Sequence, residues 1–415
     1  MFDFYGVIDL YGKGRVTQTS SPFSRYACYD FDYAEHGLRM DNALFFYLER
    51  KSNASNYVCK GLCHLFVYGF AFGNAPTRNS GSKCGNSRLR AADVLELYEE
   101  HGTECAHRMK GSYCILIYDE RENKAVIISD HLNVLPVYYA YRNGILIVSS
   151  AQKPILDSAL IDGKIDGTAI VEFAVFDHTL GERTFYDAIK QVDHAQILTV
   201  DKKGLRKAKY FSIPDLFQER RCGRAEGLEL LIEILRDNSA LYVADADKFL
   251  LALTGGFDCR MNLSLMTRDT DDYLCYSYGM PGSRQLEIPF RIAQALGLDY
   301  APIVLDDDFE RNYEDCAVRA LFYSDGTAPV LRANYPYAYG RLNAFADVAV
   351  TGLFGSEIMR PIRNLGIQIN KDSERIFMCD DLESGLRSVL EKRKMEGYVQ
   401  GDLFDACFAE LRDYL

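Results

Sequence analysis

The chain has 415 residues, of which 48% are hydrophobic and 26% charged, so we expect roughly two or three folded domains rather than a disordered protein. Its formal net charge of −12 argues against non-specific nucleic-acid binding, which depends on a basic surface. No apolar run approaches the roughly 18 residues of a membrane helix, and the start has no basic and apolar leader. The sequence therefore predicts a cytoplasmic protein with neither a membrane nor a nucleic-acid partner.

Residues 1–205 are predicted to form mostly β-structure. The turn Arg142-Asn143-Gly144 predicts a β-hairpin between two apolar segments. A helix is predicted at Ala91–His101 and a loop at Asn79–Arg88, which is rich in Ser, Gly and Asn. The expected strands are Tyr5–Tyr11, Leu62–Phe72, Ser112–Tyr118, Lys124–Ser129, Val134–Tyr141, Gly144–Ser149 and Gln196–Val200.

From residue 206 onward, helical patterns alternate with short apolar runs. Arg224–Leu241 carries leucines and an isoleucine at helical spacing, and Phe249–Leu253 is a short apolar strand. Strands that alternate with helices imply parallel βαβ units and a doubly wound sheet. Further helices are expected at Asp258–Met266, at Gln285–Leu296 and within Asp308–Phe345, and further strands at Tyr273–Tyr278, Ala301–Leu305 and Asp347–Thr351.

The residues after the first strand of this second part are the strongest candidates for chemistry, because open α/β sheets bind ligands beyond the carboxyl ends of their strands. They read Thr254-Gly255-Gly256-Phe257-Asp258-Cys259. Two glycines let backbone N–H groups approach an anion, and the N-terminus of the following helix favours one. A carboxylate at Asp258 would repel a bare phosphate and so suits a bridging Mg²⁺. The alternative is an ordinary strand–turn–helix junction with an Asp cap.

This loop resembles the Ser-Gly-Gly-x-Asp-Ser motif of ATP pyrophosphatases that adenylate their substrates. Two later segments, Tyr276–Ser283 and Val348–Glu357, are similar in order and spacing to the second and third motifs of the asparagine synthetase superfamily. Segments of the first half resemble the glutaminase-like domain of the same superfamily. They are Glu100–Asp119, Ser129-Asp130-His131, Leu135–Tyr139 and Thr184–Val192.

The resemblance implies a fold and an activity for each half. Residues 1–205 would form an α+β domain of layered β-sheets with helices, as in N-terminal nucleophile hydrolases. Residues 206–415 would form an α/β doubly wound parallel sheet of the ATP-pyrophosphatase type. The implied activity is that of an AMP-forming amide ligase: ATP and Mg²⁺ activate a small-molecule or peptide carboxylate, pyrophosphate leaves, and ammonia or a substrate amine forms the amide.

The resemblance also assigns site residues. Backbone groups of the glycine loop would hold pyrophosphate, and Asp258 would bind Mg²⁺. Glu357 would be an acid/base or metal residue. The full nucleotide-binding set implied is Leu253, Thr254, Gly255, Gly256, Asp258, Cys259, Tyr278, Thr351 and Gly352.

Several residues depart from the family pattern. A working glutaminase of this family uses an N-terminal Cys as nucleophile, whereas this chain has Phe2, so we expect a structural or substrate-shaping domain without glutaminase activity. Ser356 and Gln285 stand where the family has Asp, although Glu287 lies two residues beyond Gln285. Family members commonly continue with further helices and a lysine that stabilises the adenylated state. Candidates for that lysine here are Lys371, Lys392 and Lys394, in charged stretches that are more typical of solvated surface.

These departures motivate a second hypothesis, a non-catalytic nucleotide-binding or scaffold relative that acts with a biosynthetic partner. A third is another pyrophosphatase-loop chemistry such as tRNA thiolation, against which the acidic charge and the lack of paired CxxC motifs argue. The acid, the amine and the state of association, as a homo-oligomer or with a partner protein, stay open.

Overall fold

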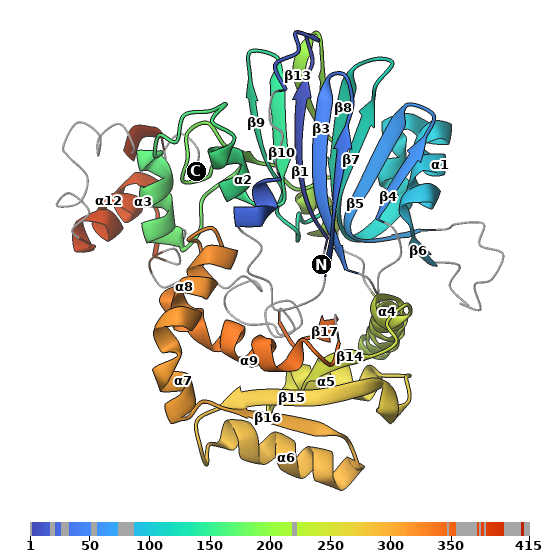
Figure 1. The fold of residues 1–415 in the computed structure, drawn as a ribbon. Coiled ribbons are helices and arrows are strands. Elements are labelled where there is room, and N and C mark those ends of the chain that lie inside the picture. The colour runs from blue at the N-terminus through green and yellow to red at the C-terminus, as the bar shows by residue number, and fades with distance from the viewer. Residues whose placement is uncertain are drawn as a thin grey trace.

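The computed structural model describes residues 2–16, 21–25, 33–50, 56–73, 87–217, 222–346, 348–353, 372, 375–376, 379–393 and 408–410. Two stacked antiparallel sheets form the first half, and a smaller parallel sheet with helices forms the second (Figure 1). Within the described ranges, every helix is too short or too polar to cross a lipid bilayer.

The first sheet has six antiparallel strands in the order β11-β9-β10-β1-β3-β2. The hairpin between β9 and β10 turns at Asn143 and Gly144, whose φ angles are 53° and 76°. Two successive positive φ angles are typical of the type I′ turn, whose twist matches that of paired strands, and the predicted hairpin is confirmed. The strands are β1 (Phe2–Asp9), β2 (Tyr33–Arg39), β3 (Ala43–Arg50), β9 (Tyr138–Arg142), β10 (Ile145–Ser149) and β11 (Lys190–Gln191).

The second sheet has seven strands in the order β13-β12-β8-β7-β5-β4, with β6 paired to β5. It faces the first sheet across an apolar core, where the ring centroids of Phe45 and Phe66 lie 5.1 Å apart and those of Phe45 and Tyr118 lie 5.8 Å apart. The strands are β4 (Tyr57–Lys60), β5 (Cys63–Gly73), β6 (Ser87–Leu89), β7 (Met109–Asp119), β8 (Lys124–Ser129), β12 (Gln196–Asp201) and β13 (Gly204–Lys209).

Helices cover the outer faces of both sheets. Val94 and Leu95 of α1 (Ala91–His101) are buried on the second sheet, and Ile155 of α2 (Gln152–Asp157) is buried on the first. The layered α+β arrangement expected for the first half is therefore confirmed. The remaining elements of this half are α3 (Gly167–Phe176) and the 3₁₀ helices η1 (Pro22–Arg25), η2 (Gly102–Arg108) and η3 (Ile213–Phe217).

The second half contains a four-stranded sheet in the order β16-β15-β14-β17, and all of its pairings are parallel. β15 and β16 lie on one side of β14 and β17 on the other, so the chain order reverses beside β14. The strands are β14 (Phe249–Ala252), β15 (Tyr273–Gly279), β16 (Tyr300–Val304) and β17 (Ala349–Val350). The helices are α4 (Arg224–Val243), α5 (Phe257–Leu265), α6 (Arg284–Leu296), α7 (Asp307–Arg311), α8 (Tyr313–Tyr323), α9 (Asn334–Leu342) and the 3₁₀ helices η4 (Thr270–Asp272) and η5 (Val330–Ala333).

Several predicted elements differ from the structure in their bounds: the strand expected at Tyr5–Tyr11 is β1 at Phe2–Asp9, and the one expected at Asp347–Thr351 is β17 at Ala349–Val350. The strand expected at Val134–Tyr141 begins only at Tyr138, because the carboxylate of Asp130 accepts hydrogen bonds from the N–H groups of Leu132 and Val134 and folds those residues into a turn. Of the loop expected at 79–88, residues 79–86 lie outside the described residues, and the last two residues belong to β6.

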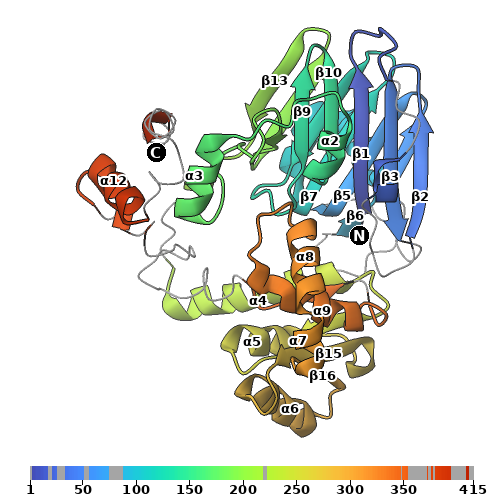
Figure 2. The same cartoon turned by 60° about the vertical axis from the view of Figure 1, so that its left-hand side comes forward.

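The two halves contact each other at several places. At the end of α4, the ring of Tyr242 lies 4.9 Å from that of Phe72, and Asp245 pairs with Arg88 at 3.6 Å. Helix α12 (Leu382–Lys392) returns to the first half and lies beside α3 (Figure 2). Its Leu386 belongs to the same buried cluster as Val171 and Val175 of α3. Residues of the second half, including α12, thus pack against the first half.

Candidate functional site

The loop between β14 and α5 and the first turn of α5 contain six of the nine predicted nucleotide-binding residues. β14 ends at Ala252 and α5 begins at Phe257, with Gly256 as its N-cap. The N–H of Gly256 donates to Thr254 Oγ1 at 3.1 Å, which closes the loop into a tight turn. Because the first backbone N–H groups of a helix have no partner within it, the loop leads directly into a set of donors, and Asp258 lies in this first turn.

The predicted third segment meets this loop. β17 pairs in parallel with β14, so Thr351 and Gly352 follow β17 at the same edge of the sheet. A methyl group on Gly352 would lie 2.9 Å from Cys259 Sγ and 3.1 Å from Asp258 Cβ, so the backbone of Gly352 packs directly against both. The amide of Asn262 on α5 also donates to the carbonyl of Thr351 at 2.9 Å. Residues almost a hundred positions apart in the chain thus meet where the chain order of the sheet reverses.

Two of the predicted residues, one in the loop and one beside it, lie in different environments. Leu253 donates its N–H to the carbonyl of Tyr276 at 2.8 Å, and its side chain is fully buried in the core below the sheet edge, so it offers a ligand only backbone groups. Tyr278 is half-buried near the end of β15, and its ring meets that of Tyr335 edge to face, with centroids 5.9 Å apart. Burial raises the pKa of the Tyr278 hydroxyl, which stays protonated at neutral pH.

The carboxylates beside the loop differ in their surroundings. Asp258 is partly exposed in the first turn of α5, whereas Glu287 on α6 forms an ion pair with Arg291 at 2.5 Å. Gln285 lies against the end of β15, where its Cβ would be 3.0 Å from a methyl group on Gly279. The predicted Glu357, and Ser356 beside it, lie outside the described residues. In the part of the chain that the structure describes, no group of three or more His, Cys, Asp or Glu side chains could hold a metal ion.

The candidate lysines do not join this site in the described structure. Lys371 and Lys394 lie outside the described residues. Lys392 donates to Asp372 at 3.1 Å, and its helix α12 lies beside α3, far from α5 (Figure 1).

In the first half, the expected nucleophile position is the start of β1. Phe2 opens this strand opposite Glu49 of β3, at the end of the sheets that faces the second half (Figure 1). The carboxylate of the next residue, Asp3, accepts a hydrogen bond from the hydroxyl of Ser150 at 3.0 Å. A phenylalanine at this position has no group that could attack an amide carbon.

A cysteine, a histidine and a glutamate meet elsewhere in the same half, a cluster that sequence reasoning did not assemble. Cys59 Sγ lies 4.0 Å from His64 Nε2, but the same nitrogen contacts the carboxylate of Glu120 at 2.9 Å, and Nδ1 contacts the hydroxyl of Tyr57 at 3.0 Å. The thiol of Cys59 instead donates to the carbonyl of Gly61 at 3.4 Å. Because both ring nitrogens are engaged by oxygen atoms, His64 is poorly placed to take a proton from Cys59.

The predicted Ser129-Asp130-His131 segment has a structural role. Asp130 is buried, and its carboxylate accepts from the N–H groups of Tyr113, Leu132 and Val134 at 2.8 to 3.2 Å. Burial raises the pKa of Asp130, although these hydrogen bonds oppose the shift. The hydroxyl of Ser129 donates to the carbonyl of Asp193 at 2.6 Å, so the segment ties β8 to the chain that precedes β12.

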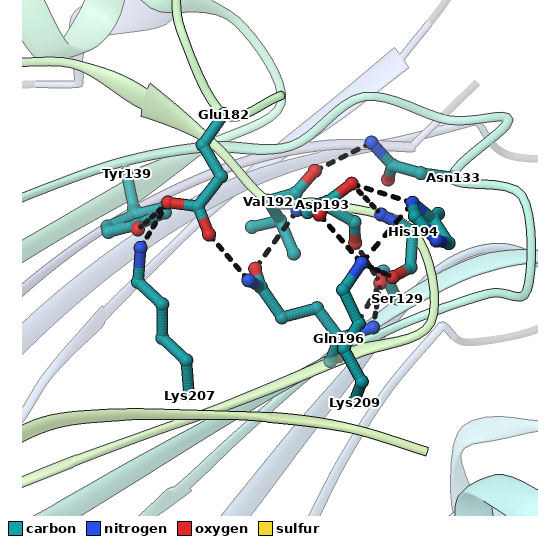
Figure 3. Close-up of polar contacts among 10 residues, drawn as sticks. All are labelled: Ser129, Asn133, Tyr139, Glu182, Val192, Asp193, His194, Gln196, Lys207 and Lys209. Atoms are coloured by element: carbon teal, nitrogen blue, oxygen red, sulfur yellow. Dashed lines mark hydrogen bonds and ion pairs between the residues drawn. The ribbon is translucent and has the colours of Figure 1, made fainter. Parts of the chain in front are cut away.

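A polar network that includes Ser129 links residues of β8, β9, β12 and β13 (Figure 3). Glu182 accepts from Gln196 Nε2 at 2.5 Å and from the hydroxyl of Tyr139 at 3.1 Å. Burial alone would raise the pKa of Asp193, but the ammonium of Lys209, 2.6 Å away, outweighs it and lowers that pKa. The network therefore ties the two ends of the predicted closing segment, Thr184–Val192, to the strands through Glu182 and Asp193.

Comparison with known proteins finds a family that part of the first half resembles. Residues 86–211 match the glutamine amidotransferase domain family. Over 64 residues the chain is 33% identical to asparagine synthetase B [glutamine-hydrolyzing] of Escherichia coli (strain K12), an alignment that covers 15% of this chain and 12% of that protein. Part of the first half is therefore similar to glutamine amidotransferase domains and, over a short stretch, to an asparagine synthetase. The resemblance predicted from the sequence is thus confirmed for this part of the chain, while the chain matches only a small part of its curated relative.

Two solved structures are similar to this chain at low identity and with low TM-scores. Glutamine phosphoribosylpyrophosphate amidotransferase from B. subtilis, complexed with ADP and GMP, is 11% identical with a TM-score of 0.26, over 63% of this chain and 51% of that one. A glutamine aminotransferase class-II domain protein from Silicibacter pomeroyi is also 11% identical, with a TM-score of 0.24, over 50% of this chain and 97% of that one.

Proposed function

We propose that the protein is an AMP-forming, ATP-dependent amide ligase whose glutaminase-like domain releases no ammonia. The observation that carries the proposal is the contact of Gly352 with Asp258 and Cys259. It joins the glycine loop after β14 to the turn after β17, at the place where ligands of open α/β sheets bind.

The loop residues supply the groups that a triphosphate needs. Gly255 and Gly256 allow the backbone to approach phosphate oxygens, and the N-terminus of α5 favours their negative charge. Close packing of Gly352 keeps the loop and the third segment in one arrangement. Parallel pairing sets Ala252 opposite Tyr276, so Tyr278 lies level with Thr254 and offers its ring beside the same edge.

Mg²⁺ fits this donor set. Mg²⁺ is commonly held by one or two carboxylates together with phosphate oxygens and water, and Asp258 is a partly exposed carboxylate beside the proposed phosphate cradle. When bound, the ion would neutralise charge on the phosphate oxygens as pyrophosphate leaves. The residues of the chain would align the substrate carboxylate with the α-phosphate, and alignment of this kind supplies a large part of the rate.

The absence of a nucleophile at Phe2 supports the proposal that the glutaminase-like domain releases no ammonia. We expect no glutamate release from glutamine, and the amine would come from free ammonia or from the substrate. A glutaminase assay on the full chain tests this. Glutamate release that is lost in Cys59→Ser would contradict the proposal, because it would identify Cys59, beside His64, as a glutaminase nucleophile.

A second candidate function is a nucleotide-binding relative without catalysis. The carboxylate of Glu287 favours this candidate, because it pairs with Arg291. Asp258 is then the candidate metal carboxylate among the described site residues, and these include no cluster of three or more potential metal ligands. Such a protein would bind ATP·Mg²⁺ but would form no pyrophosphate with any acid.

The two candidates separate in one screen. Wild-type protein is incubated with ATP·Mg²⁺, ammonium and pooled amino acids or small carboxylic acids, and pyrophosphate is measured. Release that depends on one pool supports the ligase and leads to its acid by deconvolution. ATP binding by calorimetry without release from any pool supports the non-catalytic candidate.

A further inference from the structure

The turn that follows α8 reaches across to the glutaminase-like domain. Asp325 and Gly326 both have positive φ, 50° and 83°, and this turn directs the Asp325 side chain to the start of α2. Its carboxylate is 8% exposed and accepts from the N–H of Gln152 at 2.8 Å and from Lys153 Nζ at 2.6 Å. One buried carboxylate of the second half is thus held by two groups of the first.

This carboxylate takes the place of a helix cap. The residue before α2 is Ala151, which has no side-chain oxygen to accept from the first N–H groups of the helix. Asp325 supplies that acceptor from a position 173 residues away in the chain. The α2 N-terminus therefore depends on the second half for its hydrogen bonding.

Lys153 strengthens the same joint. Its ammonium also donates to the carbonyl of Phe322, the penultimate residue of α8, and lies 4.5 Å from the centroid of the Phe322 ring. Nearby, Gly326 lies close to the ring of Phe185 in the first half, since a methyl group on it would be 4.0 Å from Phe185 Cε2. Four kinds of contact thus hold the end of α8 and the turn after it: an ion pair, a helix cap, a hydrogen bond to a carbonyl and the close approach of Gly326 to the Phe185 ring.

The segment that starts at this joint ends beside the proposed adenylation site. It continues through η5 to Tyr335 at the start of α9, whose ring contacts that of Tyr278. Arg332 donates to the Tyr335 hydroxyl at 2.9 Å and lies over its ring. Because Tyr278 is level with Thr254, the position of Tyr335 bears directly on the space beyond the strand ends.

We propose that Lys153 and Asp325 are positioning residues, through which the glutaminase-like domain holds residues 326–335 so that Tyr335 stays against Tyr278 and shapes the nucleotide side of the site. The role in nucleotide binding rests on the proposed function, whereas the hold on the segment does not. It gives a domain without an N-terminal nucleophile a task in the reaction of the other domain.

The test uses a graded set of variants in the full chain. Asp325→Asn keeps an oxygen that can accept from Gln152 and tolerates positive φ, so it removes mainly the charge. Asp325→Ala removes the cap and the pair, and Lys153→Met removes the pair and the carbonyl bond but leaves the cap. Asp187→Asn is the matched control, because Asp187 forms an exposed pair with Lys164 at 3.9 Å within the glutaminase-like domain.

The first readout is amide hydrogen exchange, which needs no activity. Exchange in residues 326–340 is expected to be about tenfold faster in Asp325→Ala and Lys153→Met than in wild type. Asp187→Asn should exchange like wild type, and Asp325→Asn should stay close to it. Unchanged exchange there in both Asp325→Ala and Lys153→Met overturns the proposal, even if the chain proves to have no ligase activity.

The second readout is kinetic, with the acid found by the pyrophosphate screen. The KM for ATP is expected to rise about tenfold in Lys153→Met, with kcat and the KM for the acid near wild type, because Tyr335 contacts Tyr278 of the proposed nucleotide-binding set. Equal losses for acid and ATP would indicate a merely structural joint and contradict the positioning role. If wild type shows no turnover with any acid, the proposed function fails, and the exchange result still decides whether the joint holds the segment.

Discussion

Asp9, at the end of β1, shows how a single buried carboxylate organises a turn. Its side chain is fully buried and accepts from the backbone N–H groups of Tyr11, Lys13 and Arg15 at 2.9 to 3.1 Å. The guanidinium of Arg15 lies 2.5 Å away, and mainly this contact lowers the pKa of Asp9 to about 2. The ionised form is therefore favoured by folding.

The sign of this shift predicts an acid-dependent stability. A carboxylate whose folded pKa is depressed stabilises the fold above its unfolded pKa, near 4, and loses that contribution as the pH falls toward 2. Asp9→Asn is expected to lower the free energy of unfolding by roughly 2 kcal/mol at neutral pH, and the difference should shrink between pH 4 and pH 2. Urea unfolding of both proteins across this range measures it. A difference that stays constant down to about pH 2 would show that the Arg15 contact does not stabilise the fold.

Among the elements, the meeting of the β14 loop with the end of β17 decides whether a site exists. Gly352 has no room for a side chain, because a methyl group would lie 2.9 Å from Cys259 Sγ and 3.1 Å from the Cys259 backbone nitrogen. This crowding cannot be relieved by a flexible side chain alone, since one of the contacts is backbone.

Gly352→Ala is therefore expected to push the third segment away from the loop and to weaken ATP·Mg²⁺ binding by roughly tenfold, in line with the usual cost of overpacking. Calorimetric titration gives the affinity. Gly223→Ala is the matched control, because Gly223 has an ordinary φ of −62° and nothing within 4 Å of an added methyl group. Equal affinities in the two variants would contradict the assigned contact.

A helix with a clear period was predictable from the sequence, whereas one of the strands with a continuous apolar run was not. The helix predicted at Ala91–His101 has those same bounds in the structure. By contrast β3, which begins with the continuous apolar run Ala43–Leu48, was not predicted. All six of these side chains are buried, so the strand lacks the alternation that reveals a half-exposed strand.

The same limit applies to the candidate site. The glycine loop could be predicted because its residues are contiguous and carry their own conformational demands. The Cys59–His64–Glu120 cluster and the Lys153–Asp325 pair could not, because their members are brought together by sheet register and by domain contact. Long-range pairs of this kind leave no local pattern in a single sequence.

At the scale of the whole molecule, side-chain contacts connect the two halves at several places. The first half contacts the second through Tyr242 at the end of α4 and through Asp325 after α8. The last described residues return to the first half, where Glu410 pairs with Arg183 at 2.7 Å. The glutaminase-like domain, which has Phe2 at the position of the family nucleophile, thus contacts the elements that surround the proposed ligase site.

The most direct test of the ligase proposal is exchange of radiolabelled pyrophosphate into ATP, with the acid found by the screen. Asp258→Asn is expected to reduce exchange by roughly 100-fold or more, because charge neutralisation by a bound divalent ion is worth several kcal/mol, and to leave thermal stability near that of wild type. Asp271→Asn, an exposed aspartate before β15 at the opposite edge of the sheet, should exchange like wild type. Exchange in Asp258→Asn equal to that in Asp271→Asn would contradict the assignment of the Thr254–Cys259 loop as the adenylation site.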